Sequence, residues 1–215
     1  MNSLIIDCSA GMGVYLKTDN NEFSFVDSNS KKHSDCLLEK VDDLLASANI
    51  SIFDIDNLGV CVGPGSFTGI RVAVSLVKGL VVSIKDKVNV FVLSNFDIYD
   101  VYNKENSVLI LDGFSNLVYV RKYQNHTFDD SCVEIEAVVK YVLDTNADVY
   151  VQSQKLQNEL KKYEINTILA QNSTVKCFCN QFENGNKIDI SQINPIYLRS
   201  SQAELEREKK LAGKK

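Results

Sequence analysis

The sequence predicts an α/β protein made of two similar lobes in tandem. Three observations support this. Apolar runs with strand character alternate with helical patterns, the order of elements in the first half recurs in the second, and each half opens with strands joined by tight turns. The chain has 215 residues, of which 45% are hydrophobic and 24% charged, which is the composition of a globular protein.

The first half begins with three short strands. Apolar runs at 4–7, 14–16 and 23–26 are separated by turns, the first of which contains Gly11 and Gly13. Strands this short with tight connections predict an antiparallel meander.

Helical spacing follows the meander. Apolar residues recur at Leu37, Leu38, Val41, Leu44, Leu45 and Ala48, with charged residues between them, which predicts an amphipathic helix. A strand over 58–62, a turn over 63–66, a helix capped by Thr68 that ends near Ser83, and a strand over 88–93 complete this half.

The second half is a weaker copy of the first. It shows strands over 108–111 and 117–123 around an Asp112-Gly113 turn, then a helix over 133–143 and a strand over 149–151. Three antiparallel strands followed by crossover helices match the duplicated ribonuclease-H-like plan of the actin, sugar-kinase and Hsp70 group.

We expect residues 1–97 to form the N-terminal lobe, joined by the C-terminal segment 196–215, and residues 98–195 to form a smaller, diverged second lobe. The charged stretch 203–215 is expected to be a solvated helix or a frayed tail.

Charge and cysteine content limit the class of protein. A net charge of −5 argues against a chain that holds nucleic acid by itself, because such affinity depends on Lys and Arg neutralising phosphates.

The six cysteines include no C-x-x-C pair and are expected to be reduced thiols. With no basic and apolar leader at its start, the chain is expected in the cytoplasm. The apolar stretch 70–84 contains Arg71 and Lys78 and is too short to predict a membrane span.

The segment Gly63-Pro64-Gly65-Ser66-Phe67-Thr68-Gly69 is the most distinctive motif. No Lys-Ser or Lys-Thr follows its second glycine, and it lacks the G-x-S-x-G pattern of a hydrolase nucleophile. Two readings remain open: a backbone cradle for a phosphate at a helix start, or a strand-to-helix turn. Asp7 likewise reads either as a carboxylate near metal and phosphate or as a local cap.

The histidines do not form a metal site in the sequence. His33 has Leu37 four residues later, so the paired histidines that clamp a metal on one helix face are missing, and His126 lies far away. The helix over 70–83 is apolar nearly all round, so one half of it is expected to cover its sheet and the other half to meet the second lobe or a partner.

Several segments resemble the TsaB (YeaZ) family. They run over 33–45, 63–71 and 78–80, together with the opening Leu4-Ile5-Ile6-Asp7-Cys8-Ser9 and the closing Pro195-Ile196-Tyr197-Leu198-Arg199. The second lobe departs from the family, with Asp112-Gly113-Phe114 and Leu117-Val118-Tyr119 in place of an Asp-Ala-Arg turn and a Glu-Val-Tyr strand.

This resemblance implies a paralogue of the catalytic subunit TsaD that lacks its histidine metal ligands. The chain would be a non-catalytic subunit of the complex that forms N6-threonylcarbamoyladenosine at position 37 of tRNAs. TsaD would be its direct partner, TsaE would join through the complex, tRNA would be contacted only indirectly, and the chain alone would form a homodimer.

The resemblance also implies site residues. The two predicted helices would pack against the equivalent pair of TsaD, with an interface at His33, Leu37, Val41, Leu44, Val74 and Lys78. The nucleotide or structural loop would comprise Asp7, Gly63, Pro64, Gly65, Ser66, Thr68, Gly69 and Arg71. No resident cofactor or metal is predicted, and any ATP or ADP is expected at the interface with TsaD.

Three alternatives stay open from sequence alone. The first is an ATP-dependent kinase or ATPase of the same fold that uses Asp7 and the glycine loop. The second is a metallopeptidase, which would need histidines that the chain lacks. The third is a binding module unrelated to tRNA.

Overall fold

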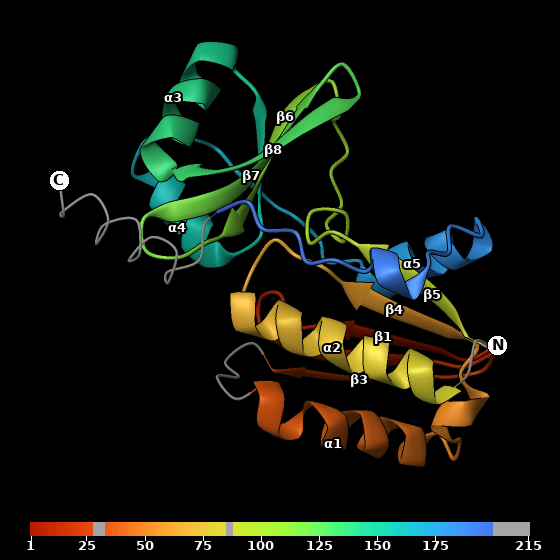
Figure 1. Ribbon diagram of the computed structural model, residues 1–215. Coiled ribbons are helices and arrows are strands. Elements are labelled where there is room, and N and C mark those ends of the chain that lie inside the picture. Colours follow the sequence, from red (N-terminus) through yellow and green to blue (C-terminus); the bar gives the residue numbers. More distant parts are fainter. Residues whose placement is uncertain (28–32, 85–87, 200–215) are drawn as a thin grey trace, which may run out of the picture.

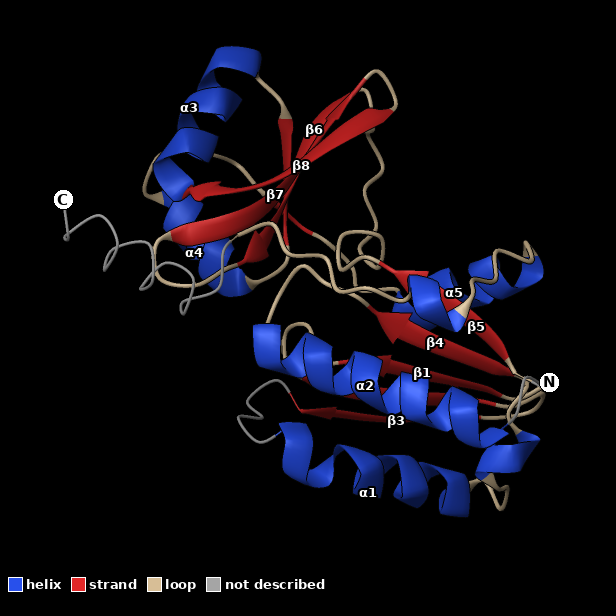
Figure 2. Cartoon of the chain, in the orientation of Figure 1, coloured by secondary structure: helices blue, strands red, loops and turns tan. Residues whose placement is uncertain are grey.

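The computed structural model describes residues 1–27, 33–84 and 88–199 and shows two lobes, each built on a five-stranded sheet (Figure 1). The helices lie outside the sheets, and several long loops meet where the lobes face each other (Figure 2).

The first sheet has the order β3-β2-β1-β4-β5. Its strands are β1 (Ser3–Asp7), β2 (Met12–Lys17), β3 (Glu22–Asp27), β4 (Asn57–Cys61) and β5 (Asn89–Leu93). β1 pairs antiparallel with β2 and parallel with β4. The predicted meander is therefore confirmed, and it continues into parallel strands through crossover helices.

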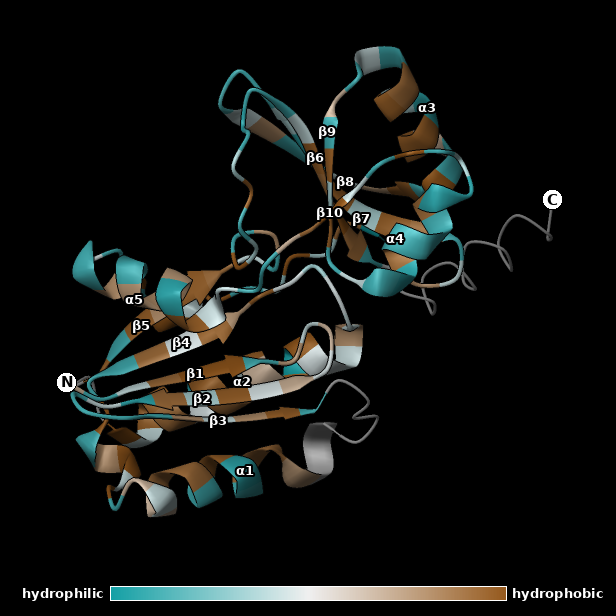
Figure 3. Cartoon of the chain, turned by 180° about the vertical axis from the view of Figure 1, so that it is seen from behind, coloured by the Kyte–Doolittle hydropathy of each residue, from teal (hydrophilic) through white to brown (hydrophobic). Residues whose placement is uncertain are grey.

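Helices cover both faces of this sheet. α1 (His33–Ser47) and α2 (Phe67–Ile84) lie side by side on one face (Figure 1). α5 (Thr174–Glu183) packs on the other face, where Phe178 is fully buried among Ile5, Phe91 and Leu93. Because β1 and β4 are covered on both sides, they are buried along nearly their whole lengths and are apolar at their centres (Figure 3).

The second sheet repeats the first as β8-β7-β6-β9-β10. Its strands are β6 (Asn106–Asp112), β7 (Leu117–Gln124), β8 (Thr127–Glu134), β9 (Asp148–Val151) and β10 (Ile168–Leu169). α3 (Ile135–Thr145) and α4 (Gln154–Lys161) stand where α1 and α2 stand in the first lobe. The predicted duplicated α/β plan is confirmed.

The sequence did not predict β8, α4, β10 or α5. β8 is an edge strand with a polar sequence, and it takes up Val133, which the sequence placed in a helix. α4 is largely hydrophilic, with Leu156 and Leu160 as its buried residues (Figure 3). α5 is short and mixes polar residues with Phe178 and Phe182, which lie four residues apart and pack in the same cluster. Short 3-10 turns over Ile52–Asp54 and Ile190–Gln192 add no layer.

The chain returns to the first lobe earlier than expected. α5 packs on β5, and residues 188–196 contribute Ile188, Ile190, Ile193 and Ile196 to the core under α1 and α2. α5 and residues 188–196 therefore pack on the first lobe, although all but the last of these residues fall within the range 98–195 expected for the second. The stretch 203–215 lies outside the described residues.

α2 is an apolar helix on one face of the first sheet (Figure 1). Its 18 residues have a mean hydropathy of 1.7, so by length and composition it is long enough to cross a membrane. A stripe from Gly69 through Ala73 and Val77 to Ile84 is buried toward β1 and β4. Core helices of globular proteins have this composition too, and 39% of α2 is buried inside this fold.

Candidate functional site

The glycine-proline loop joins β4 to α2. The backbone turns at Gly63, where φ is +99°, and the Ser66 hydroxyl accepts the N–H of Gly69 at 3.2 Å. Ser66 therefore caps α2, which begins at Phe67, and the predicted cap at Thr68 is wrong.

The same loop presses on the turn that follows β1. A Cβ at Gly65 would lie 2.2 Å from the carbonyl oxygen of Ser9, and one at Gly69 would lie 2.1 Å from that of Cys8. The backbone N–H of Ser66 also donates to the Ser9 oxygen at 2.8 Å. These glycines are needed for backbone-to-backbone packing, which favours the structural reading of the motif.

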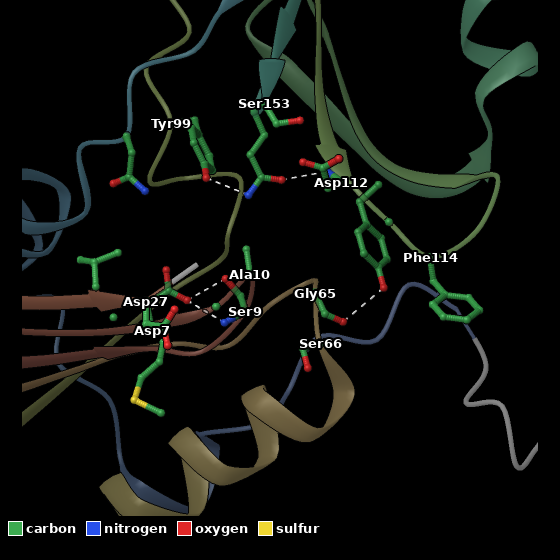
Figure 4. Close-up of a pocket in the computed structure, with 18 of the residues that line it drawn as sticks. Asp7, Ser9, Ala10, Asp27, Gly65, Ser66, Tyr99, Asp112, Phe114 and Ser153 are labelled. Atoms are coloured by element: carbon green, nitrogen blue, oxygen red, sulfur yellow. Dashed lines mark hydrogen bonds between the residues drawn. The ribbon is translucent and has the colours of Figure 1, made fainter. Parts of the chain in front are cut away.

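Asp7 ends β1 and is held locally. Its Oδ1 accepts the backbone N–H of Ser9 at 2.9 Å and the Ser9 hydroxyl at 2.6 Å. This is the local cap that the sequence left open, and Asp7 also borders the space between the lobes (Figure 4).

A cleft of about 920 Å³ separates the lobes. Of the predicted loop residues, Asp7, Gly65, Ser66 and Thr68 line it, while Gly63, Pro64, Gly69 and Arg71 do not. The lining also includes residues of the opposite lobe and of the loops around it, among them Tyr99, Asp112, Phe114, Tyr119, Gln152, Ser153, Lys155, Asn172 and Arg199.

A polar network on the second-lobe side orders part of the cleft (Figure 4). The N–H of Asp112 donates to Gln152 Oε1 at 2.7 Å, and Gln152 Nε2 donates to the Tyr99 hydroxyl at 2.8 Å. Burial raises the pKa of Tyr99 to about 12, so this hydroxyl keeps its proton at neutral pH. Lys155 Nζ lies 3.8 Å from Asp112 Oδ1.

The sequence predicts the turn at Asp112 but gives no sign of the other residues of this network. Tyr99 comes from the connection between the lobes and Gln152 from the end of β9, so neither forms a local motif. Among the described residues, no group of three His, Cys, Asp or Glu side chains could hold a metal ion.

The predicted interface residues lie mostly in the core. Leu37 and Val41 are each 1% exposed, Val74 is 5% exposed and Leu44 is 7% exposed. They pack between the helices and the first sheet, so in this conformation they are not accessible to a second molecule. Lys78 is partly exposed, and the side chain of His33 lies outside the described residues.

The outward surface of α1 and α2 carries other apolar residues. Leu38 is 53% exposed and Val82 is 72% exposed. Val72, Leu76 and Leu80 are partly buried and recur every four residues along α2. A Cβ added at Gly79 would meet nothing within 4 Å.

Arg71 belongs to the closing segment rather than to the cleft. Its Nε donates to the Tyr197 hydroxyl at 2.7 Å, and Tyr197 stacks on Phe67 with ring centroids 4.6 Å apart. The predicted loop residue therefore fixes the C-terminal segment over the start of α2.

Comparison with known proteins agrees with this architecture. The family model described as "TsaD: tRNA N6-adenosine threonylcarbamoyltransferase" matches residues 27–204. The chain is 25% identical to the tRNA threonylcarbamoyladenosine biosynthesis protein TsaB of Escherichia coli, with 86% of each chain covered. It is 30% identical to the TsaB of Haemophilus influenzae, over 48% of this chain and 43% of that protein.

A solved structure has the same fold. YeaZ from Pseudomonas aeruginosa superposes with a TM-score of 0.71 at 21% identity, covering 92% of this chain and 99% of that one. The duplicated sheets and the interlobe cleft thus define a two-lobed α/β protein of the actin, sugar-kinase and Hsp70 type. The chain belongs to the TsaD family and, within it, to the TsaB (YeaZ) group.

Proposed function

We propose that this chain is a non-catalytic subunit of the complex that forms N6-threonylcarbamoyladenosine at position 37 of tRNAs, and that the outer surface of α1 and α2 binds the catalytic subunit TsaD. Membership of the TsaB group supports a role in this modification. The exposed apolar surface of the two helices carries the assignment of the interface.

Three features make this surface suitable for another helix pair. Leu38 and Val82 expose most of their side chains, and the stripe from Val72 to Leu80 presents a further apolar ridge. Gly79 leaves open space beside this ridge. A glycine in a helix ridge lets a facing helix approach closely, because ridges pack into grooves at distances set by the side chains at the contact.

The interface prediction therefore moves from buried to exposed residues. Glutamate at Val41 or Val74 would put a charge in the core and unfold the lobe, which would not test binding. In the absence of TsaD, the same surface is expected to pair with a second copy, since a self-complementary patch closes as a twofold dimer.

Two backbone N–H groups at the glycine-proline loop already have hydrogen-bond acceptors within the protein, which supports the non-catalytic assignment over the kinase or ATPase alternative. The Ser66 N–H is bound to Ser9, and the Gly69 N–H is bound to Ser66. A phosphate bound to these two N–H groups would have to displace the Ser9 carbonyl oxygen and the Ser66 hydroxyl. ATP or ADP therefore belongs, in this proposal, at the interface with TsaD, while TsaE and tRNA join through the complex in the cytoplasm.

The experiment measures binding of the purified chain to TsaD from the same source. Leu38→Glu and Val82→Glu place charges at exposed sites of the fold, and we expect the double variant to weaken binding at least 100-fold, because buried interface anchors contribute about 2 kcal/mol or more each. The matched control is Leu143→Glu, at a residue 68% exposed on α3 of the second lobe.

Two outcomes would contradict the proposal. Unchanged affinity in the double variant would remove α1 and α2 from the interface. ATP turnover by the isolated chain, with no association with TsaD and no effect on threonylcarbamoyl transfer to tRNA, would favour the kinase-like alternative.

A further inference from the structure

The closing segment is attached to the first lobe by its backbone and by an aromatic ring. The N–H of Ile196 donates to the carbonyl oxygen of Val62 at 2.7 Å. Tyr197 lies parallel to Phe67, with 2° between the ring planes, and receives the hydrogen bond from Arg71. Residues 195–197 are therefore fixed over the first turn of α2.

The next residues reach the second lobe through Arg199. The guanidinium carbon of Arg199 lies 5.1 Å from the ring centroid of Phe67 and 5.4 Å from that of Phe114. Phe67 starts α2 of the first lobe, and Phe114 lies in the β6–β7 turn of the second. A cation between two aromatic faces is attracted by both, so Arg199 links the lobes.

A hydrogen-bonded chain makes a second link at the same place. Arg199 Nε donates to the Tyr119 hydroxyl at 3.2 Å, and that hydroxyl donates to the carbonyl oxygen of Gly65 at 3.3 Å. Tyr119 is on β7 and Gly65 is in the loop before α2, so this chain also crosses from one lobe to the other.

The covalent connections between the lobes lie on the other side of the cleft. The segments that cross there pair with each other: the Asp100 N–H donates to Gln171 at 3.0 Å and the Ser173 N–H donates to Ile98 at 2.7 Å. Figure 4 places Tyr99, from this region, at one side of the cleft and Phe114 at the other. Two paired segments on one side form a hinge about which the far rim could open.

We propose that residues 195–199 form an interlobe clasp, in which Arg199 between Phe67 and Phe114 holds the rim of the cleft closed opposite the hinge. Arg199 lines the cleft, and so do the three residues that it contacts: Phe67, Phe114 and Tyr119. Release of Arg199 therefore widens the cleft while each sheet keeps its own core. The proposal is independent of which protein binds α1 and α2.

Hydrogen exchange on the full chain, read by mass spectrometry, tests the clasp. Arg199→Ala should speed exchange about tenfold, equivalent to about 1.4 kcal/mol, in two segments at once: the β6–β7 turn and the 63–69 loop. Exchange in β1 and β6 should stay unchanged, because their cores do not depend on the clasp. Arg199→Lys keeps the charge but loses the planar face, so it should give a smaller acceleration.

The matched control is Lys122→Ala, which removes a cation–π contact of 4.4 Å to Tyr141 within the second lobe alone. Phe114→Ala supplies an independent variant, because a side chain 60% exposed can be truncated without emptying the core. It should reproduce the effect of Arg199→Ala. Acceleration confined to 195–199 in both variants, or none at all, would overturn the proposal, since the segment would then be a local strap with no hold on the second lobe.

Discussion

The backbone N–H of Ser66 donates to the carbonyl oxygen of Ser9 at 2.8 Å, which joins the start of α2 to the turn after β1. Gly65 and Gly69 lie on either side of this bond and leave no room for a side chain. The most distinctive sequence motif of the chain thus acts as a joint between two backbone segments, and its glycines serve close approach rather than an open cradle.

Two glycines of α2 should respond in opposite ways to alanine. In Gly69→Ala the new Cβ would lie 2.1 Å from the Cys8 carbonyl oxygen, so we expect a loss of about 1–3 kcal/mol in the free energy of unfolding, as for an overpacked core. In Gly79→Ala the Cβ meets nothing within 4 Å, and the helix should gain up to about 1 kcal/mol. Urea titrations of both variants measure the difference, and equal effects would refute the close approach at Gly69.

Periodicity was enough to predict much of the fold. The spacing of Leu37, Val41 and Leu44 predicts α1 correctly, because a stripe that covers a sheet must repeat every three to four residues. The same spacing does not reveal which neighbour covers the stripe. The expectation that these residues meet a partner is wrong in this conformation, because their own sheet covers them.

Tertiary arrangement explains what the sequence did not reveal. α5 is held in place by its contact with β5, and this contact forms only because the chain returns from the second lobe to the first. Tyr99, Gln152 and Arg199 line one cleft but come from three separate segments of the chain, so no local spacing marks them. The Asp7 cap, by contrast, is local and was one of the two readings available from sequence.

Removing the buried Arg121 should destabilise the chain strongly. Its side chain is 5% exposed, its Nε lies 2.6 Å from Asp130 Oδ1, and it also pairs with Asp97. Burial alone would lower the pKa of Arg121, but the hydrogen bonds to Asp130 and the charge of Asp97 raise it, so the group stays charged.

In Arg121→Met we expect a loss of about 3 kcal/mol in the free energy of unfolding, the low end for breaking a buried pair, because Asp97 keeps contact with water. Lys162→Met is the control, since it breaks an exposed pair with Glu159 and should cost less than about 1 kcal/mol. If chemical denaturation gave the two variants comparable losses in the free energy of unfolding, the buried ion pair would stabilise the protein no more than the exposed one.

Native Cys8 should react slowly with alkylating reagents. Burial, with a smaller contribution from the charge of Asp7, raises the pKa of Cys8 from 9.0 to about 12. At pH 8 roughly 10⁻⁴ of the folded thiol is ionised, against about a tenth of the unfolded one. Mass spectrometry after iodoacetamide treatment should show Cys8 modified far more slowly than the half-buried Cys179 until urea is added.

The same shift has a consequence for stability. The protonated thiol is favoured in the folded state, so its contribution is complete below about pH 9 and is lost as the pH rises from there towards 12. The free energy of unfolding should therefore fall over this alkaline range, and Cys8→Ser should flatten part of the decline. Rapid native labelling of Cys8 at pH 8 would contradict the burial on which both expectations depend.

Phe178 should stabilise the first lobe although its helix follows the second lobe in the chain. It is fully buried, and its ring occupies the space where a Cβ of Gly59 would lie, 2.6 Å from that position. Phe178→Ala would leave a cavity between α5 and the first sheet, with an expected cost of about 3–5 kcal/mol. Phe53→Ala, at a residue 69% exposed, serves as the control and should change stability little. Hydrogen exchange locates the loss: faster exchange in β1 and β5 with β6 and β9 unchanged would assign α5 to the first lobe, and faster exchange in β6 and β9 instead would return it to the second.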